Sequence, residues 1–322
     1  MSSGHEDDEK LQRIFMPTAD ARIEKLIKDN GRLAHYTTAE AALSIIESKS
    51  IWLRNAMGMS DFSEVRYGFN QLSGYFQDEA KRNRFSTTFD GIDANIVQRA
   101  IQLFDQWWGH IQTNTFMTCF SEHGSSEDQY GRLSMWRAFG KNIAGVAIVI
   151  RCPEKYSALP LKAMLRPVIY MDRPDWLDHE LQKVVANVNS NHAYLETLDP
   201  SQVVVALYQM LHLTAVTLKH QGFHEEREWR LCYFPMHSKS DHVLEETRTI
   251  SGIPQVIHKV VFENKPAQLI TKIELPELLD RVIIGPSQYA LSTAQALSKA
   301  LKEAKVENPD SKIFISDIPI RG

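Results

Sequence analysis

One apolar run strongly constrains what this chain can fold into. Gly145-Val-Ala-Ile-Val-Ile150 contains no polar residue. Branched apolar residues that follow one another without alternation are typical of a strand buried on both faces. The run is far shorter than the roughly 20 apolar residues of a membrane span, and no other stretch approaches that length. The sequence therefore predicts a buried sheet core.

Patterns on both sides of this run predict further strands and helices. β-rich runs lie at 32–37, 51–54, 115–120, 165–170, 228–234, 255–262, 281–285 and 312–316. Apolar residues at helical spacing lie at 19–30, 38–48, 61–76, 90–110, 130–139, 175–190, 200–220 and 290–304. The two kinds of element alternate irregularly, and several helical stretches are too long for compact parallel crossovers. We expect an α+β fold with a mixed β-sheet core and several helical insertions.

The domain organisation is expected to be simple. Residues 1–16 are acidic and predict a flexible N-terminal segment. No clear linker follows, so residues 17–322 are expected to form a single α+β domain with helical insertions near 61–110 and 175–220. Ser60-Asp61-Phe-Ser-Glu64 has the spacing of a helix cap with a reciprocal glutamate. It would have a functional role only if it faced the end of the 32–37 strand.

The charge balance excludes a general attraction to polyanions. Thirty-six basic and 40 acidic residues leave a formal net charge of −4, although a local basic patch remains possible. Cys119, Cys152 and Cys232 are widely spaced within apolar runs and lack metal-ligand spacing. The N-terminus has no apolar signal core. A cytoplasmic protein in a reducing compartment, with no membrane association, is the resulting expectation.

The segment His35-Tyr36-Thr37 closes the first predicted strand with three side chains that can bind polar groups. It is followed at once by the 38–48 helix and then by the 51–54 strand. A histidine satisfied in the core beside a packed tyrosine is the structural interpretation. A site that holds a ligand at the end of the strand is the functional one.

A second charged cluster begins the strand at 228–234. Glu226 and Glu228 are two residues apart, and on an extended chain this spacing would put both carboxylates on one face. Two like charges on one face repel. Arg227 and Arg230 could neutralise them, or a paired carboxylate could act on a substrate as a base or stabilise a developing cation on a ribose. Both interpretations stay open.

Other motifs are individually unremarkable or missing. Ser121 follows a strand directly, and Trp136 in a short amphipathic helix is expected in the core. The sequence contains no Walker loop, Gly-x-Gly-x-x-Gly, Gly-x-Ser-x-Gly elbow or zinc ligand set. Phosphate-binding glycine chemistry and metal-dependent hydrolysis are therefore poorly supported, and no metal is expected.

Together these segments resemble the DUF2971 family, a group of mostly bacterial proteins whose name states no function. The resemblance spans roughly residues 32–319. The segment at Ser60 departs from it, because the family usually has Asn there. The resembling segments are His35-Tyr36-Thr37, Ile51–Arg54, Ser60–Glu64, Cys119–Ser121, Met135-Trp136, Gly145–Ile148, Glu226–Arg230, Ile283–Gly285 and Ser316–Pro319.

A looser resemblance points to ADP-ribosyltransferase folds, which have a split sheet and use NAD as a substrate. By this resemblance His35 would bind the ribose, Glu228 would be the catalytic glutamate and Glu226 an auxiliary carboxylate. Such a glutamate stabilises the positive charge that develops on the ribose. The usual Ser-Thr-Ser or Tyr element has no clear counterpart unless Phe120-Ser121 serves. The expected NAD-binding residues are His35, Tyr36, Thr37, Trp52, Arg54 and Ser121, with Tyr36 and Trp52 as candidates for stacking on nicotinamide.

The resemblance implies an enzyme that transfers ADP-ribose to a target or hydrolyses NAD, in the setting of a bacterial toxin or anti-phage effector. The acceptor would be an unidentified protein or nucleic acid, and an antitoxin or other partner protein is a further expectation. A non-catalytic binding or regulatory module of a defence system is the alternative from another class. A nucleic-acid-modifying enzyme is the third. The geometry of His35 and Glu228 distinguishes the first two. A large distance between His35 and Glu228, or an ion pair of Glu228 with Arg227 or Arg230 away from any cleft, would favour the module.

Overall fold

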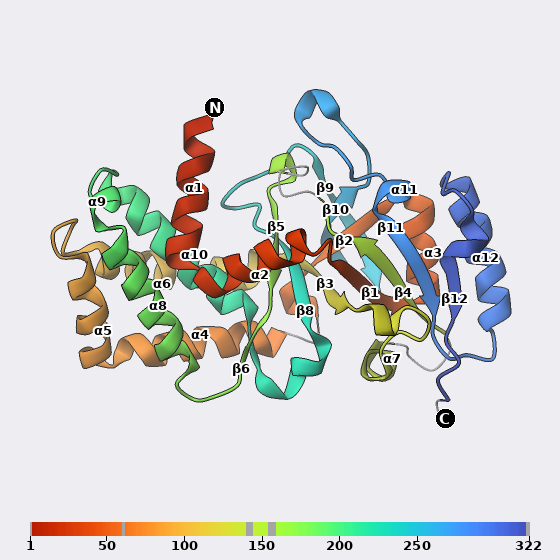
Figure 1. Ribbon diagram of the computed structural model, residues 1–322, viewed down its shortest axis with the longest axis horizontal. Helices are drawn as coiled ribbons and strands as arrows, with labels where there is room; N and C mark the ends of the chain where they lie inside the picture. The colour runs from red at the N-terminus through yellow and green to blue at the C-terminus, as the bar shows by residue number, and fades with distance from the viewer. Residues whose placement is uncertain (1, 60–61, 140–143, 154–158, 320–322) are drawn as a thin grey trace. The chain divides into compact units, whose positions relative to one another are not determined.

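The computed structural model describes residues 2–59, 62–139, 144–153 and 159–319. The chain forms two compact units, each assembled from segments that are distant in sequence. Unit 1 contains Met1–Glu24, Ala56–Thr115 and Pro167–Phe223, and unit 2 contains Lys25–Asn55, Phe116–Arg166 and His224–Gly322. Figure 1 gives the labels of the elements used below.

The boundaries between the units fall inside or next to regular elements. Glu24 and Lys25 both lie in helix α2 (Pro17–Lys28), and Arg166 and Pro167 both lie in strand β5 (Ala163–Pro167). Composition shifts and glycine-rich stretches therefore do not mark them. The helical insertions predicted near 61–110 and 175–220 lie in the second and third segments of unit 1.

Unit 1 is mainly helical and is built around α10 (Pro200–Thr217). This helix is buried on nearly all sides, as expected for a helix that is apolar all round, and it contacts α4 and α6. α4 approaches closely at Gly68, where an added Cβ would lie 2.2 Å from the carbonyl oxygen of Ala215. The remaining elements are α1 (Ser2–Phe15), α4 (Phe62–Gln77), α5 (Glu79–Ser86), α6 (Ile96–Asn114), α8 (Trp176–Ser190), α9 (His192–Leu195), β6 (Ile169–Met171), β7 (Leu218–His220), and the short 3-10 segments η1 (Ala56–Gly58) and η2 (Thr87–Phe89).

Residues 2–15, for which the composition suggested a flexible segment, form helix α1. Phe15 is buried, and its ring stacks on Phe89 with 6.3 Å between the centroids. The hydroxyl of Tyr194 donates to Asp7 Oδ1 at 2.7 Å. These partners lie far along the chain, so the local acidic composition gives no sign of them.

The described residues of unit 2 form a ten-stranded sheet. Its main path runs β12-β11-β4-β1-β3-β2-β10-β9, and β8 pairs with β3 and β5. β11 and β12 are parallel, whereas β4, β1, β3 and β8 pair as antiparallel neighbours, so the predicted α+β fold with a mixed sheet is confirmed. The strands are β1 (Arg32–Thr38), β2 (Ser50–Asn55), β3 (Phe116–His123), β4 (Gly145–Arg151), β5 (Ala163–Pro167), β8 (Glu228–Tyr233), β9 (Val243–Ile250), β10 (Ile253–Val261), β11 (Leu279–Ile284) and β12 (Ile313–Ile315).

Both faces of the sheet are covered at β4, as its apolar run predicts. Val146 and Ile148 pack in one cluster with residues of α3 (Ala39–Ser48) and α12 (Ala290–Glu303). Ala147 and Val149 pack in another cluster with residues of α7 (Leu133–Phe139). Unit 2 also contains α11 (Leu275–Leu278) and the 3-10 segments η3 (Ser125–Glu127), η5 (Leu159–Leu161), η7 (Pro266–Gln268) and η8 (Pro309–Lys312), while η6 (Gln221–Glu226) crosses the unit boundary.

Strand β3 is where the sheet divides. One edge of β3 pairs with β8 from Phe116 to Ser121. The other edge pairs with β2 at Phe116 and Met117, and with β1 only from Ser121 to His123. β1 and β2 therefore diverge along the middle of this edge.

Two strand predictions differ from the structure. The single strand expected over 165–170 is divided into β5, which pairs with β8, and β6, which pairs with β7 in a separate sheet. Pro167 ends β5, in keeping with its missing N–H donor. β9 was not predicted, because Glu245, Glu246 and Arg248 interrupt its apolar pattern. The predicted cap at Ser60-Asp61 lies outside the described residues. Among the described helices, none combines the length and apolar character that a membrane crossing requires.

Candidate functional site

Three of the motif segments lie on neighbouring strands of unit 2. In the β1–β3 register Ala34 is opposite Ser121, and in the β3–β8 register Ser121 is opposite Glu228. Residues directly opposite each other in antiparallel strands share a face of the sheet. Segments separated by nearly two hundred residues therefore form one row across β1, β3 and β8.

Ser121 holds the chain that leads into β8. Its side chain is fully buried, and its hydroxyl donates a hydrogen bond to the backbone carbonyl of Glu226. The same hydroxyl oxygen accepts a hydrogen bond from Arg132 Nη1 at 2.6 Å. In this structure the serine predicted to bind NAD is engaged with the protein itself.

Arg132 connects these strands to the loop after β3. Its guanidinium donates to the carbonyl oxygens of Glu122 and Glu225 at 2.6 and 2.8 Å, and to both carboxylate oxygens of Glu127 at 2.7 and 3.1 Å. Burial acts to raise the pKa of Glu127, but hydrogen bonds from Arg132 and from the Gly124 N–H outweigh it and hold that pKa below its ordinary value. The loop is therefore fixed by charge-assisted hydrogen bonds.

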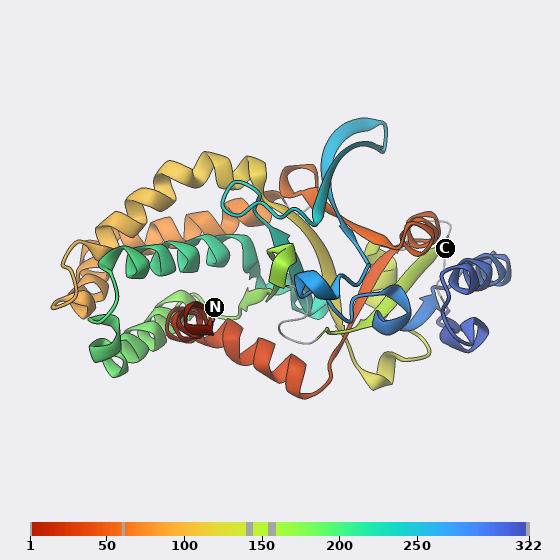
Figure 2. The same ribbon diagram turned by 90° about the horizontal axis from the view of Figure 1, so that it is seen from above.

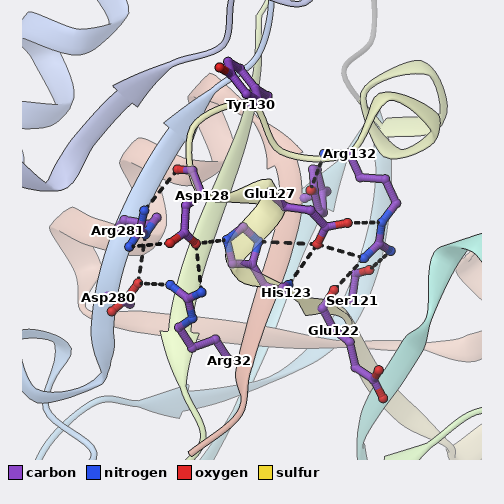
Figure 3. A network of polar contacts seen from close by, with 12 residues as sticks. Arg32, Ser121, Glu122, His123, Glu127, Asp128, Tyr130, Arg132, Asp280 and Arg281 are labelled. Atoms are coloured by element: carbon purple, nitrogen blue, oxygen red, sulfur yellow. Dashed lines mark hydrogen bonds and ion pairs between the residues drawn. The ribbon is translucent and has the colours of Figure 1, made fainter.

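A chain of hydrogen bonds and ion pairs continues from this loop, as Figure 3 shows. His123 Nε2 lies 3.0 Å from Asp128 Oδ1, and Asp128 also binds Arg32 at 2.8 Å and Arg281 at 3.2 Å. Both arginines bind Asp280 as well, each at 2.9 Å. Burial lowers the pKa of His123, so the imidazole is favoured in its neutral form.

Asp280 is bound by three arginines of this network. It accepts hydrogen bonds from Arg281 and Arg32 and, at 2.6 Å, from Arg151. Burial acts to raise its pKa, but these arginines outweigh burial and hold the pKa of Asp280 well below its ordinary value. Strands β1, β4 and β11 are thereby joined through one carboxylate.

Glu228 and Arg230 form a buried ion pair. Arg230 Nε donates to Glu228 Oε1 at 2.7 Å, and Nη2 donates to Oε2 at 3.3 Å. Arg230 is fully buried and Glu228 is 4% exposed. The pair is formed between residues i and i+2 on one face of β8, which is the neutralising arrangement that the sequence left open.

Glu226 lies outside strand β8, so the alternation on which the sequence expectation rested does not apply to it. It ends the 3-10 segment η6, and the following Arg227 has φ +43°, in the left-handed region. β8 begins only at Glu228. The alternation argument fails because the chain is not extended at Glu226, whose carbonyl turns back to Ser121 instead.

His35 lies at the point where β1 leaves β3. Its Nδ1 is 2.9 Å from the carbonyl oxygen of Cys119, which can only accept, so Nδ1 carries the proton and Nε2 the lone pair. Its ring lies 5.6 Å from that of Phe120, and burial lowers the pKa of His35. Because side chains alternate along a strand, His35 leaves the sheet on the face opposite to Ala34, Ser121 and Glu228.

The other predicted residues lie on β1 and β2, which are interior strands of the sheet. Tyr36 is buried, with its ring edge-on to Trp136 at 4.8 Å and its hydroxyl accepting from the Arg132 N–H at 2.9 Å. Burial raises the pKa of Tyr36 to about 12. Trp52 and Arg54 belong to β2, which pairs with β10, and Arg54 Nη2 donates to Gln255 Oε1 at 3.3 Å. Thr37 is opposite Val146 in β4.

Sequence reasoning missed the ion-pair network. Arg32, His123, Glu127, Asp128, Arg132, Asp280 and Arg281 were not singled out as site residues. The available signal was the density of charged residues in the polar loop after β3, with Glu127 and Asp128 placed four and five residues beyond His123. In the described part of the chain, no group of three or more His, Cys, Asp or Glu side chains is placed to hold a metal ion.

The comparison with protein families gives one match. The model of the family described as "Protein of unknown function (DUF2971)" matches residues 135–231, from α7 to β8, and confirms the DUF2971 resemblance over this segment. No curated protein and no solved structure matches the chain.

Proposed function

We propose that the chain is an NAD-consuming enzyme of the ADP-ribosyltransferase type, which transfers ADP-ribose to a target or hydrolyses NAD. The observation that carries the proposal is the row across β1, β3 and β8, with Ser121 directly opposite Glu228. Phe120-Ser121 would then correspond to the Ser-Thr-Ser or Tyr element of the ADP-ribosyltransferase folds, for which the sequence had no clear counterpart. The resemblance alone did not require these strands to be neighbours.

The proposed chemistry needs a carboxylate beside the ribose. Cleavage of the bond between nicotinamide and ribose leaves the bonding electron pair on nicotinamide, and positive charge develops on the sugar. Water or an acceptor group then forms a new bond to the ribose carbon that held nicotinamide, and the attacking group releases its proton. In this structure Glu228 is paired with Arg230, so the proposed chemistry requires the carboxylate to exchange this ion pair for the charge that develops on the sugar.

A second function is favoured by a different observation. The Glu228–Arg230 ion pair is buried, and His35 leaves the sheet on the other face. This is the arrangement expected of a non-catalytic binding or regulatory module, in which the charged motif stabilises the sheet. A nucleic-acid-modifying enzyme has no comparable observation in its favour, so nucleic acid enters only as a possible acceptor of ADP-ribose.

The deciding experiment compares wild type, Glu228→Gln and Glu226→Gln in the presence of NAD. Released nicotinamide and labelled ADP-ribose on lysate protein or nucleic acid are measured, and circular dichroism checks the fold. We expect wild type and Glu226→Gln to consume NAD and Glu228→Gln to lose at least a hundredfold in rate, in the range of one catalytic electrostatic contact. If Glu228→Gln does not fold, Glu228→Asp keeps the charge and tests the same position.

A wild type that neither consumes NAD nor labels any target would reject the enzyme and leave the binding module. Equal activity of wild type and Glu228→Gln would reject the assigned role of Glu228. His35→Asn adds a finer test, since Asn keeps a donor for the Cys119 carbonyl but has no counterpart of Nε2. An active His35→Asn variant would make His35 a positioning residue. The toxin or effector setting predicts growth arrest on expression of wild type and none with Glu228→Gln.

A further inference from the structure

The hairpin of β9 and β10 carries an open strand edge. β10 pairs with β9 on one side and β2 on the other, whereas β9 has β10 as its neighbour and is the last strand of the path through the described sheet. Figure 2 shows this hairpin projecting from the rest of unit 2. An edge strand presents unpaired N–H and C=O groups and can pair with a further strand.

Three large apolar side chains of this hairpin are exposed to solvent. Leu244 is 46% exposed, Val256 is 44% exposed and Ile253 is 62% exposed. Leu244, Glu246, Arg248 and Ile250 alternate along β9 and therefore share one face of the ribbon. Ile253 is opposite Ile250 in the β9–β10 register and lies on this same face.

The sequence of β9 is complementary to itself when it is reversed. In a two-fold symmetric antiparallel pair, the axis passes midway between the two copies of one residue, which is therefore opposite its own copy. If that residue is Thr247, Glu246 is opposite Arg248 of the other strand, twice, and Leu244 is opposite Ile250, twice. A register centred on Glu246 would oppose two glutamates, and one centred on Arg248 would oppose two arginines. Like charges directly opposite each other destabilise a sheet.

We propose that two copies of this chain associate through β9, in antiparallel register centred on Thr247. The two sheets then continue as one across the interface, and the open edge of each copy is covered by the other. Two ion pairs lie at the centre of one face, with Leu244 and Ile250 paired at either end. On the other face Thr247 is opposite Thr247, and Glu245 is opposite Thr249.

The groups required for pairing are already held in position within one copy. Arg248 Nε donates to Glu246 Oε2 at 2.9 Å along the strand, and Lys259 Nζ lies 3.7 Å from Glu246 Oε1. These contacts hold the charged groups of Glu246, Arg248 and Lys259 on the face of the ribbon that carries Leu244. Pairing adds an oppositely charged neighbour across the axis for both Glu246 and Arg248, at side chains that solvent still reaches.

Two charge-reversed variants test the register. Glu246→Arg places two cations on this face of β9, and Arg248→Glu places two anions there. Sedimentation velocity of the full chain at low salt should show a wild-type dimer. Each variant alone should associate at least about tenfold more weakly, because two attractive cross-strand pairs become repulsive. An equimolar mixture of the variants should regain association, since every opposed pair is again of opposite sign.

Three results would overturn the proposal. The first is a monomeric wild type at concentrations on the order of 100 µM, where weak homodimers assemble. The second is a dimer that neither reversal weakens, which would place the interface elsewhere. The third is a mixture that stays dissociated although both variants have wild-type circular dichroism. None of these readouts depends on NAD, so the interface is tested separately from the proposed enzyme.

Discussion

Replacing Arg132 by methionine should loosen the junction of β1, β3 and β8. Methionine keeps an unbranched apolar side chain but removes the guanidinium. The variant leaves the Glu127 carboxylate without its bidentate partner and leaves the carbonyls of Glu122 and Glu225 without this donor. Ser121 loses its contact with the arginine but keeps its own donation to the Glu226 carbonyl.

The magnitude follows from burial. Removing one member of a buried ion pair reduces the free energy of unfolding by about 3–5 kcal/mol. Arg132 and Glu127 keep 12% and 13% of their side-chain surface exposed, so we expect a loss near the lower end, about 3 kcal/mol. In a double-mutant cycle with Glu127→Gln, the coupling free energy should be about 1.5–3 kcal/mol, the range for hydrogen bonds to charged groups.

The assay has to be local as well as global, because two compact units can unfold separately. Urea denaturation gives the global value, and hydrogen exchange in peptides from β3 and β8 reports the junction itself. Arg137→Met in α7, at an exposed position, is the matched control. A loss below about 1 kcal/mol, or exchange in β3 and β8 no faster than in the control, would refute the reasoning.

Acidification gives an independent check on the same pair. The pKa of folded Glu127 lies below its ordinary value, so its contribution to stability is present above the unfolded pKa. That contribution is lost as pH falls through the folded pKa. The difference in stability between wild type and Arg132→Met should therefore narrow as the pH falls from neutral into the acid range. A difference that widens would contradict the assignment.

Two further predictions use other parts of the molecule. Gly68→Ala should destabilise the chain by about 1–3 kcal/mol or more, because its Cβ would lie 2.2 Å from the Ala215 carbonyl oxygen. Gly74→Ala in the same helix is the control, because its Cβ would meet nothing within 4 Å. Equal thermal melting points of the two variants would contradict this prediction. Asp280→Asn should lower the urea midpoint at neutral pH, because it leaves three arginines without their shared carboxylate. The difference in urea midpoint from wild type should shrink in acid, where the depressed pKa of wild-type Asp280 is reached. A difference that does not depend on pH would count against the network.

Local patterns in the sequence were sufficient to predict most strands of the sheet. The unbroken apolar run at Gly145–Ile150 required a strand covered on both faces, and β4 is covered by helices on both. Thr38 caps α3, and Lys49 ends it in the left-handed region, so a short helix between β1 and β2 could be predicted from its own residues. Where the conformation of a segment depends on neighbours a few residues away, the sequence pattern predicts it.

The candidate site depends on partners that no local pattern specifies. Arg32 binds Asp280 across 248 positions of sequence, and Ser121 binds the Glu226 carbonyl across 105. Glu226 and Glu228 looked like one face of a strand, but the left-handed backbone at Arg227 separates them. Spacing predicts a shared face only where the backbone conformation is uniform, and the turn at Arg227 is fixed by contacts with β3.

The interleaving of the two units sets an order of events at the ribosome. The last segment of unit 1 ends at Phe223, so all its pieces have been synthesised while much of unit 2 is still missing. β4 pairs with β11, so one edge of β4 stays unpaired until residues 279–284 have emerged. β11 in turn waits for residues 313–315 of β12. Unit 1 can close first, while a nascent β1–β4 sheet keeps an apolar edge exposed. That interval is when the growing chain is most prone to aggregate or to bind a chaperone.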